Sequence, residues 1–302
     1  MEIWKLILSA TVSALIAFIV GMTYAGIRRK IIARAQNRVG PPIYQNFIDV
    51  TKLWAKTSNI NHGIMQHLAP LWLIAMSITT LLFIPIVYGS HFFTNLTFNG
   101  DLVLLLYLMV FGPLGMALGA GQTGNPNSTI GVSRGLTQMV GFEIPWVIAL
   151  ISLMIQYKTT SVSDLVAIQQ QQHTWFLFSS PFAFLAALMT LPGMFRYSPF
   201  DIVGAPAELA SGPISEFGGK YLGLMMTSGS IFAFVKLTLF VDLFMAGATN
   251  LGTLILKTFA VYMYPVLWSI VSPRFRTEQA VRYFWGWPLF FGLIGLIQAT
   301  IF

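Results

Sequence analysis

The chain has 302 residues, of which 56% are hydrophobic and only 9% are charged, and its net charge is +7. A soluble domain carries roughly a quarter charged residues, so this composition excludes a soluble globular protein and predicts an integral helical membrane protein. The chain contains no cysteine, which excludes disulfides, a cysteine nucleophile and iron–sulfur clusters held by its own thiolates.

Apolar runs of near-spanning length recur along the whole chain. They predict eight transmembrane helices, at residues 3–27, 68–88, 101–121, 130–156, 174–195, 220–245, 251–271 and 281–302. We therefore expect an all-α integral membrane protein formed by a single polytopic domain, residues 1–302. The sequence has no internal repeat, so it offers no support for an inverted-repeat transporter.

The basic residues between these segments are distributed unevenly. Most lie in the first, fifth and seventh loops (about 28–67, 196–219 and 272–280) or beside them: Arg28, Arg29, Lys30, Arg34, Arg38, Lys52, Lys56, Arg196, Lys220, Arg274, Arg276 and Arg282. The opposite face has only Lys5 and Lys158. Since positive loops stay inside, we expect a multi-pass protein of the plasma or inner membrane, with odd-numbered loops cytoplasmic and both termini outside.

The first loop contains a further predicted helix, after a stop at residues 40–42. Over residues 43–56, apolar residues recur at three- and four-residue steps and face away from Asn46, Asp49 and Lys52. This spacing predicts an amphipathic helix at the membrane surface. Two interpretations of it stay open, a helix that rests on lipid and a docking element with Asp49 and Lys52 as its candidate contacts.

Several polar side chains fall inside predicted spans, namely Arg134, Gln138, Glu143, Lys236, Asp242 and Lys257. An ionisable group at membrane depth costs about 2.5–3.5 kcal/mol on the insertion scale, so it usually faces a partner or a water cavity. Pro145 frees the carbonyl of Gly141 and favours a polar niche near Glu143, for which we prefer a proton relay to a structural ion pair. For Lys236 and Asp242, a structural ion pair with another helix fits as well as a role in proton transfer, and snorkelling suffices for Lys257.

The fifth loop is the most informative segment. It is long, is punctuated by prolines and glycines, and carries Arg196, Asp201, Glu208 and Glu216. Irregular polar backbone beside a bilayer needs protein or water as a partner, so this loop is predicted to be part of a working site. We expect Arg196 and Asp201 to form a charged pair there.

Catalytic and metal-binding patterns are absent from the sequence. The histidines at positions 62, 67, 91 and 173 have no metal-ligand spacing and are interpreted as interfacial residues. The sequence also lacks a dinucleotide fingerprint and a phosphate loop. We therefore expect no catalytic residue and no metal site in this chain, which fits a non-catalytic subunit of a larger enzyme.

Four pieces of the sequence, in order, resemble one family. They are RAQNRVGPP with FIDVTKLWAK, then RGLTQMVGFEIP, then FRYSPFD with AELASGPISEF, and finally SPRFRTEQ. Together they resemble the subunit 1 (H subunit) family of respiratory complex I and its relatives in energy-converting membrane-bound nickel–iron hydrogenases. The resemblance covers nearly the whole chain and implies a polar coupling path through Arg134, Gln138, Glu143, Asp201, Glu208 and Glu216, and docking contacts by Arg196, Arg274 and Arg276.

Two departures point to a branch of this family. Gly204 and Pro206 stand where quinone-reducing members carry glutamates, and the turn at 211–213 is similar to that of the hydrogenases and the related sulfane reductases. The resemblance thus implies a membrane-anchor and coupling subunit of a ferredoxin-linked oxidoreductase that moves H⁺ or Na⁺. Iron–sulfur and nickel–iron cofactors would reside in a hydrogenase-like peripheral arm, beside antiporter-like membrane subunits.

Two alternatives remain open. One is the quinone-binding subunit of a true NADH/quinone-type complex I, against which the missing glutamates count. The other, from a different class, is a stand-alone secondary transporter, against which the long fifth loop and the absence of a repeat count.

Overall fold

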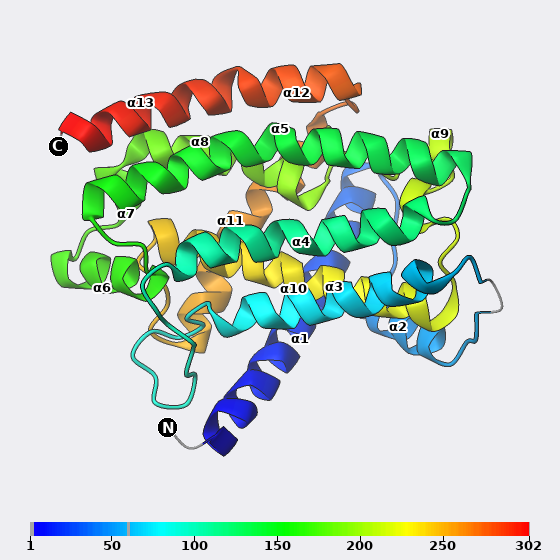
Figure 1. The fold of residues 1–302 in the computed structure, drawn as a ribbon, viewed down its shortest axis with the longest axis horizontal. Coiled ribbons are helices and arrows are strands. Elements are labelled where there is room, and N and C mark those ends of the chain that lie inside the picture. The colour runs from blue at the N-terminus through cyan, green and yellow to red at the C-terminus, as the bar shows by residue number, and fades with distance from the viewer. Residues whose placement is uncertain (1–2, 59–60, 302) are drawn as a thin grey trace. The chain divides into compact units, whose positions relative to one another are not determined.

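The computed structural model describes residues 3–58 and 61–301, and within these stretches all regular structure is helical (Figure 1). The helices are α1 (Ile3–Ala35), α2 (Gln45–Trp54), α3 (Ile64–Leu82), α4 (Asp101–Gly121), α5 (Pro126–Tyr157), α6 (Val162–Gln172), α7 (Phe176–Ser179), α8 (Pro181–Phe195), α9 (Pro206–Leu209), the 3₁₀ helix η1 (Gly212–Ile214), α10 (Gly219–Phe244), α11 (Leu251–Val271), α12 (Thr277–Trp285) and α13 (Trp287–Ile301).

Seven of the described helices are long and apolar enough to cross a membrane, with α12 and α13 together forming one of them. They are Trp4–Ala35, Ile64–Leu82, Asp101–Gly121, Pro126–Tyr157, Gly219–Phe244, Leu251–Val271 and Thr277–Ile301. The predicted fold class, an all-α membrane protein, is confirmed. The amphipathic helix of the first loop is also present, as α2.

The fifth predicted span, 174–195, is interrupted. A short α7 ends at Ser179, and the 15-residue α8 starts at Pro181. Proline lacks an amide hydrogen and disfavours helical geometry in the residue before it, and Ser180 accordingly leaves the helical region with φ −130° and ψ 61°. The apolar helix α8 is therefore shorter than the roughly 20 residues that a straight span needs.

Two other boundaries differ from the sequence prediction. Helix α1 continues to Ala35, because the basic stretch after residue 27 is rich in residues with good helix propensity. Helix α3 starts at Ile64 and ends at Leu82, shortly before Pro85, whereas the predicted span was 68–88.

The chain forms two compact units. Unit 1 consists of Met1–Leu81, Tyr107–Leu136 and Val203–Lys236, as far as these are described. A buried apolar cluster joins α3, α4, α10 and the fifth loop within this unit, through Ala69, Met116, Ala120, Met225 and Phe217. Phe217 belongs to the fifth loop, so the core of unit 1 fixes the end of that loop.

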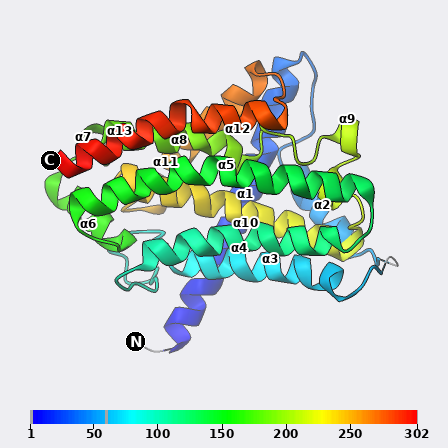
Figure 2. The same cartoon turned by 45° about the horizontal axis from the view of Figure 1, so that its top comes forward.

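Unit 2 consists of Leu82–Leu106, Thr137–Ile202 and Leu237–Phe302, as far as these are described. Figures 1 and 2 show α13 running along α8, where the Gly295 Cα lies close to the Ala183 backbone. Aromatic rings form much of the packing: Phe200 stacks on Phe284 with ring centroids 4.5 Å apart, and Phe284 also lies against Gly193. These contacts hold the start of the fifth loop against α8 and α12.

Candidate functional site: the fifth loop and its charged partners

The fifth loop follows a tightly turned path. It contains α9 and η1, and positive φ angles occur at Ala205, Ala210, Ser211, Gly212 and Gly219. Its middle part lies on α5 within unit 1. A methyl group added to Gly131 would come 2.6 Å from the Pro213 Cδ and 3.0 Å from the Val203 carbonyl oxygen. The glycine on α5 therefore provides the surface on which the loop rests.

Adding that methyl group should dislodge the loop. We expect Gly131→Ala to destabilise the packed loop by about 1–3 kcal/mol, as overpacking of a close contact typically does. Limited proteolysis within residues 205–215 should then be faster. The control is Gly229→Ala on α10, where a new Cβ would meet nothing within 4 Å. Equal cleavage rates in the two variants would show that the loop does not depend on this contact.

Glu208 is held by a cation from α5. An Arg134 Nη1 donates to the Glu208 Oε2 over 2.9 Å, and the two side chains are 31% and 52% exposed. An ion pair this open is worth about 0–1 kcal/mol, so its contribution to stability is small. The interaction instead places an acidic and a basic group side by side at the surface of unit 1.

Glu216 lies in a denser polar network. The Asn125 Nδ2 donates to its Oε1 over 2.6 Å, and the His62 Nε2 lies 3.5 Å from its Oε2. Its backbone carbonyl accepts from the Nε2 of the fully buried Gln66, whose Oε1 in turn accepts from the His62 N–H over 2.6 Å. His62 was interpreted from sequence as an interfacial residue, but it is a neighbour of the Glu216 carboxylate.

Asp201 pairs with an arginine of the last loop, in unit 2. The Arg274 Nη2 lies 3.3 Å from the Asp201 Oδ2. Backbone contacts hold the two segments together, because the Phe275 N–H donates to the Pro199 carbonyl and the Ser198 hydroxyl donates to the Ser272 carbonyl. The expected pairing of Asp201 with Arg196 is therefore wrong.

Arg196 directly follows the last residue of α8. It caps the end of α8 in the left-handed region, with φ 54°, and its side chain is exposed. Arg276 is also exposed, at the start of α12, where its backbone N–H donates to Gln279. Both arginines thus stay accessible, as docking contacts would require.

The polar groups of α5 have separate surroundings. The buried Gln138 donates to the Gly193 carbonyl over 3.1 Å, in unit 2. Glu143 is half-buried, and α5 continues through Pro145 beside it. One turn further, the buried Trp146 Nε1 has no acceptor among the described residues. Lys236, on α10, is also half-buried.

Helix α2 is fixed against α1. The Asp49 carboxylate lies 3.3 Å from an Arg29 Nη1, and Lys52 is exposed. Asn46 was predicted on the polar face, but it is buried: it donates to the Met22 carbonyl and accepts from Arg29 over 2.6 Å. Because the amide nitrogen and the amide oxygen of Asn46 are both hydrogen-bonded within unit 1, its burial costs little free energy. Hydropathy alone does not reveal such partners.

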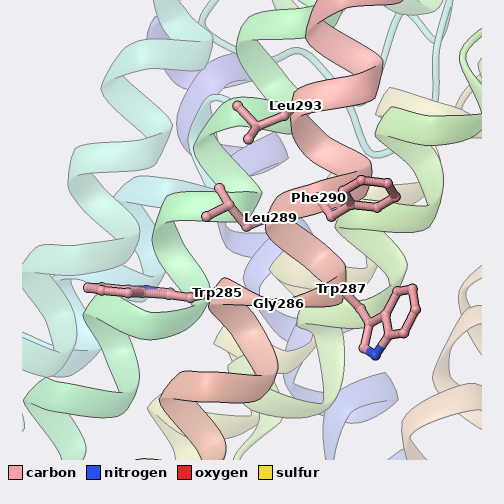
Figure 3. A pocket seen from close by; sticks show the side chains of 6 residues that line it. All are labelled: Trp285, Gly286, Trp287, Leu289, Phe290 and Leu293. Atoms are coloured by element: carbon pink, nitrogen blue, oxygen red, sulfur yellow. The ribbon is translucent and has the colours of Figure 1, made fainter.

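The remaining candidate residues lie in unit 2. Asp242 is completely buried in the last turn of α10, and the Lys257 Nζ binds backbone carbonyls near the start of α11. The described residues contain no group of three or more potential metal ligands. A groove on α12 and α13, drawn in Figure 3, is lined by the apolar side chains Trp285, Trp287, Leu289, Phe290 and Leu293 together with Gly286, so it offers no group for chemistry.

A polytopic helical fold with a long loop of paired acidic residues is the architecture expected of a membrane subunit of a complex I-related assembly. The family model described as NADH dehydrogenase matches residues 8–300, and the chain belongs to this family. The chain is 28% identical to the H subunit of the NADH-quinone oxidoreductase of Carboxydothermus hydrogenoformans over 82% of this chain and 73% of that protein. It is 27% identical to the corresponding H subunit of Bacillus cytotoxicus, over 94% of this chain and 89% of the relative.

A solved structure agrees in fold over nearly the whole length. It is a chain of the membrane-bound sulfane sulfur reductase, an archaeal respiratory membrane complex, with a TM-score of 0.91 and 32% identity over 97% of this chain and 99% of that one. The protein is thus a membrane subunit of a complex I-related complex. The sequence-based resemblance to the subunit 1 family of complex I is confirmed.

Proposed function

We propose that this chain is the membrane-anchor and coupling subunit of a ferredoxin-linked oxidoreductase of the hydrogenase or sulfane reductase type. The observation that carries the proposal is the arrangement of the fifth loop, in which Asp201, Glu208 and Glu216 each lie within 3.5 Å of a basic side chain. A loop built from such pairs responds to a charge brought near it. The similarity to the sulfane sulfur reductase chain supports this branch of the family.

Coupling would operate through electrostatics. A charge that changes near the loop during electron transfer alters the balance within each carboxylate–cation pair, since groups within about 4–6 Å influence one another's protonation. Glu208 and Glu216 would change occupancy first, and Glu143 would respond deeper in α5. Linkage requires that the effect runs in both directions, so an imposed ion gradient would in turn slow electron transfer.

The proposal includes an orientation and a set of partners. The loops at about 28–67, 196–219 and 272–280 would face the cytoplasm, with both termini outside, as the distribution of basic residues favours. The exposed Arg196, Arg276 and Lys52 would contact a hydrogenase-like peripheral arm that carries the iron–sulfur and nickel–iron cofactors. Antiporter-like membrane subunits would complete the path for H⁺ or Na⁺.

A second function is favoured by the names of the relatives. Two of them are NADH-quinone oxidoreductase subunits, and a quinone-binding role is the natural alternative. Gly204 and Pro206 count against it, because they supply no carboxylate on the loop. Assaying the purified complex with a quinone and with a sulfur compound as acceptors separates the two: quinone-dependent turnover would overturn our choice of branch.

Expression of the chain alone tests the assembly itself. With its basic loops uncovered, the isolated chain should aggregate or be degraded, whereas co-expression with the neighbouring subunits should stabilise it. Size-exclusion chromatography in detergent would measure this. A monodisperse chain recovered without partners would argue against an obligate subunit and in favour of a transporter.

A further inference from the structure

Asp242 is a buried carboxylate that lacks the partners such a group needs. It is 0% exposed in the last turn of α10, and neither of its side-chain oxygens has a hydrogen-bond partner among the described residues. Asp101, also 0% exposed, makes a useful contrast: its oxygens accept from the Val162 N–H over 2.9 Å and from the Ser161 hydroxyl over 3.3 Å. Burying an ionised carboxylate without such bonds is costly, so Asp242 is suited to carry a proton.

The cation nearest to this carboxylate is bound to something else. The Lys257 Nζ donates to the carbonyl oxygens of Met245 and Gly247, over 2.7 and 2.5 Å, and lies 5.2 Å from the centre of the Trp175 ring. Carbonyl oxygens and an aromatic face are a favourable site for an ammonium group. Lys257 is nonetheless the charged side chain whose field acts on Asp242.

Gly247 connects the two groups. A methyl group at this glycine would lie 3.1 Å from the Asp242 Oδ1, while its own carbonyl binds Lys257. Ala246 and Gly247 both have left-handed backbones, with φ 58° and 56°, which turns the chain sharply between α10 and α11. The carboxylate and the ammonium group therefore both adjoin this glycine.

Helix α6 fixes this turn. The buried Gln169 donates to the Asp242 carbonyl over 2.9 Å and accepts from the Ala246 N–H over 2.9 Å, and Gln170 donates to the Ala246 carbonyl. The groups that α6 presents to the site are thus uncharged glutamines, with Val166 beside Gly247. Because the backbone is held in place, the flexible four-carbon chain of Lys257 is the part of the site that can move.

We propose that Asp242, Lys257 and the carbonyl oxygens of Met245 and Gly247 form a proton-exchange site in which the Lys257 ammonium is a tethered counter-ion. With Asp242 protonated, the ammonium group stays on the two carbonyls. When Asp242 releases its proton to water at the 245–250 turn, the ammonium moves to the carboxylate, and it returns when a proton is taken up again. One proton enters and leaves per cycle, while the lysine stays charged throughout.

The inference deepens the proposed coupling function, on which it rests for its role in ion movement. Its chemistry can be tested without any measurement of ion movement. An apolar carbodiimide reacts with a protonated carboxyl group to give an activated ester. The ester then rearranges to a stable N-acylurea, in which the whole reagent has been added to the carboxyl group. The yield of this product therefore reports how much of the carboxyl group is protonated at a given pH.

Dicyclohexylcarbodiimide should therefore be applied to membranes that contain the complete complex, followed by chymotryptic digestion and mass spectrometry. We expect an acylurea on Asp242 whose yield falls as the pH is raised. In Lys257→Met, which lacks the counter-ion, labelling of Asp242 should persist to higher pH, because a nearby cation favours the ionised carboxylate. An unmodified Asp242 would overturn the proton site, and the same pH dependence of labelling in Lys257→Met would overturn the role of Lys257 as counter-ion. Either result would leave the coupling function itself untouched.

Discussion

Replacing Glu143 by glutamine should leave the complex assembled while its ion translocation falls at least several-fold. Glutamine keeps the shape and most hydrogen bonds of the side chain but cannot exchange a proton. Glu143 is half-buried in a membrane-spanning helix, two residues before a proline, and an ionisable group at such a depth is usually functional.

The measurement is redox-driven ion uptake into proteoliposomes that contain the complete complex, with the electron-transfer rate recorded in parallel. Asp164→Asn is a suitable control, because this carboxylate is exposed at the start of α6 and the change removes the same kind of charge. Normal ion uptake by the Glu143→Gln complex would show that Glu143 has a structural role and is not a proton relay.

Removing either member of the Asp201–Arg274 pair should detach the peripheral arm. In the free subunit the side chains are 40% and 30% exposed, so the pair itself is worth only about 0–1 kcal/mol and the fold should survive. Covered by a docked partner, the same pair would lose its water. Deleting one charge would then leave the other unpaired, at a cost of roughly 3–5 kcal/mol if it is well buried.

Native gels of mutant membranes would measure the loss of the arm in Asp201→Ala and Arg274→Ala. Lys158→Ala is the control: this lysine is exposed in the loop after α5, and an exposed charge contributes little. If both loop variants run as the intact complex, the segment around Asp201 is not the docking surface.

The hydropathy pattern, together with the positions of proline and glycine, predicted most of the helices. The spans at 101–121 and 251–271 match α4 and α11 in the structure. The errors have local physical causes: Pro181 divides a segment whose composition alone predicted one continuous span, and the basic end of α1 stays helical although it leaves the apolar region. Such boundaries depend on backbone geometry, which an average over apolar residues does not capture.

The pairs around the fifth loop were much harder to foresee. Glu216 meets His62 across 154 positions of the sequence, and Asp201 meets Arg274 across 73. No periodicity links residues that far apart, and the choice of partner depends on the turns at 205–212 and on the aromatic packing of Phe200. The acidic residues could be recognised from sequence, but their partners could not.

The most direct test of the coupling role is to purify the assembly through a tag on this chain, reconstitute it in liposomes and drive it with reduced ferredoxin. The account predicts that redox subunits co-purify and that electron transfer builds an H⁺ or Na⁺ gradient, which a matching ionophore collapses. Electron transfer at a normal rate with no gradient, or a chain that purifies without partners, would contradict it.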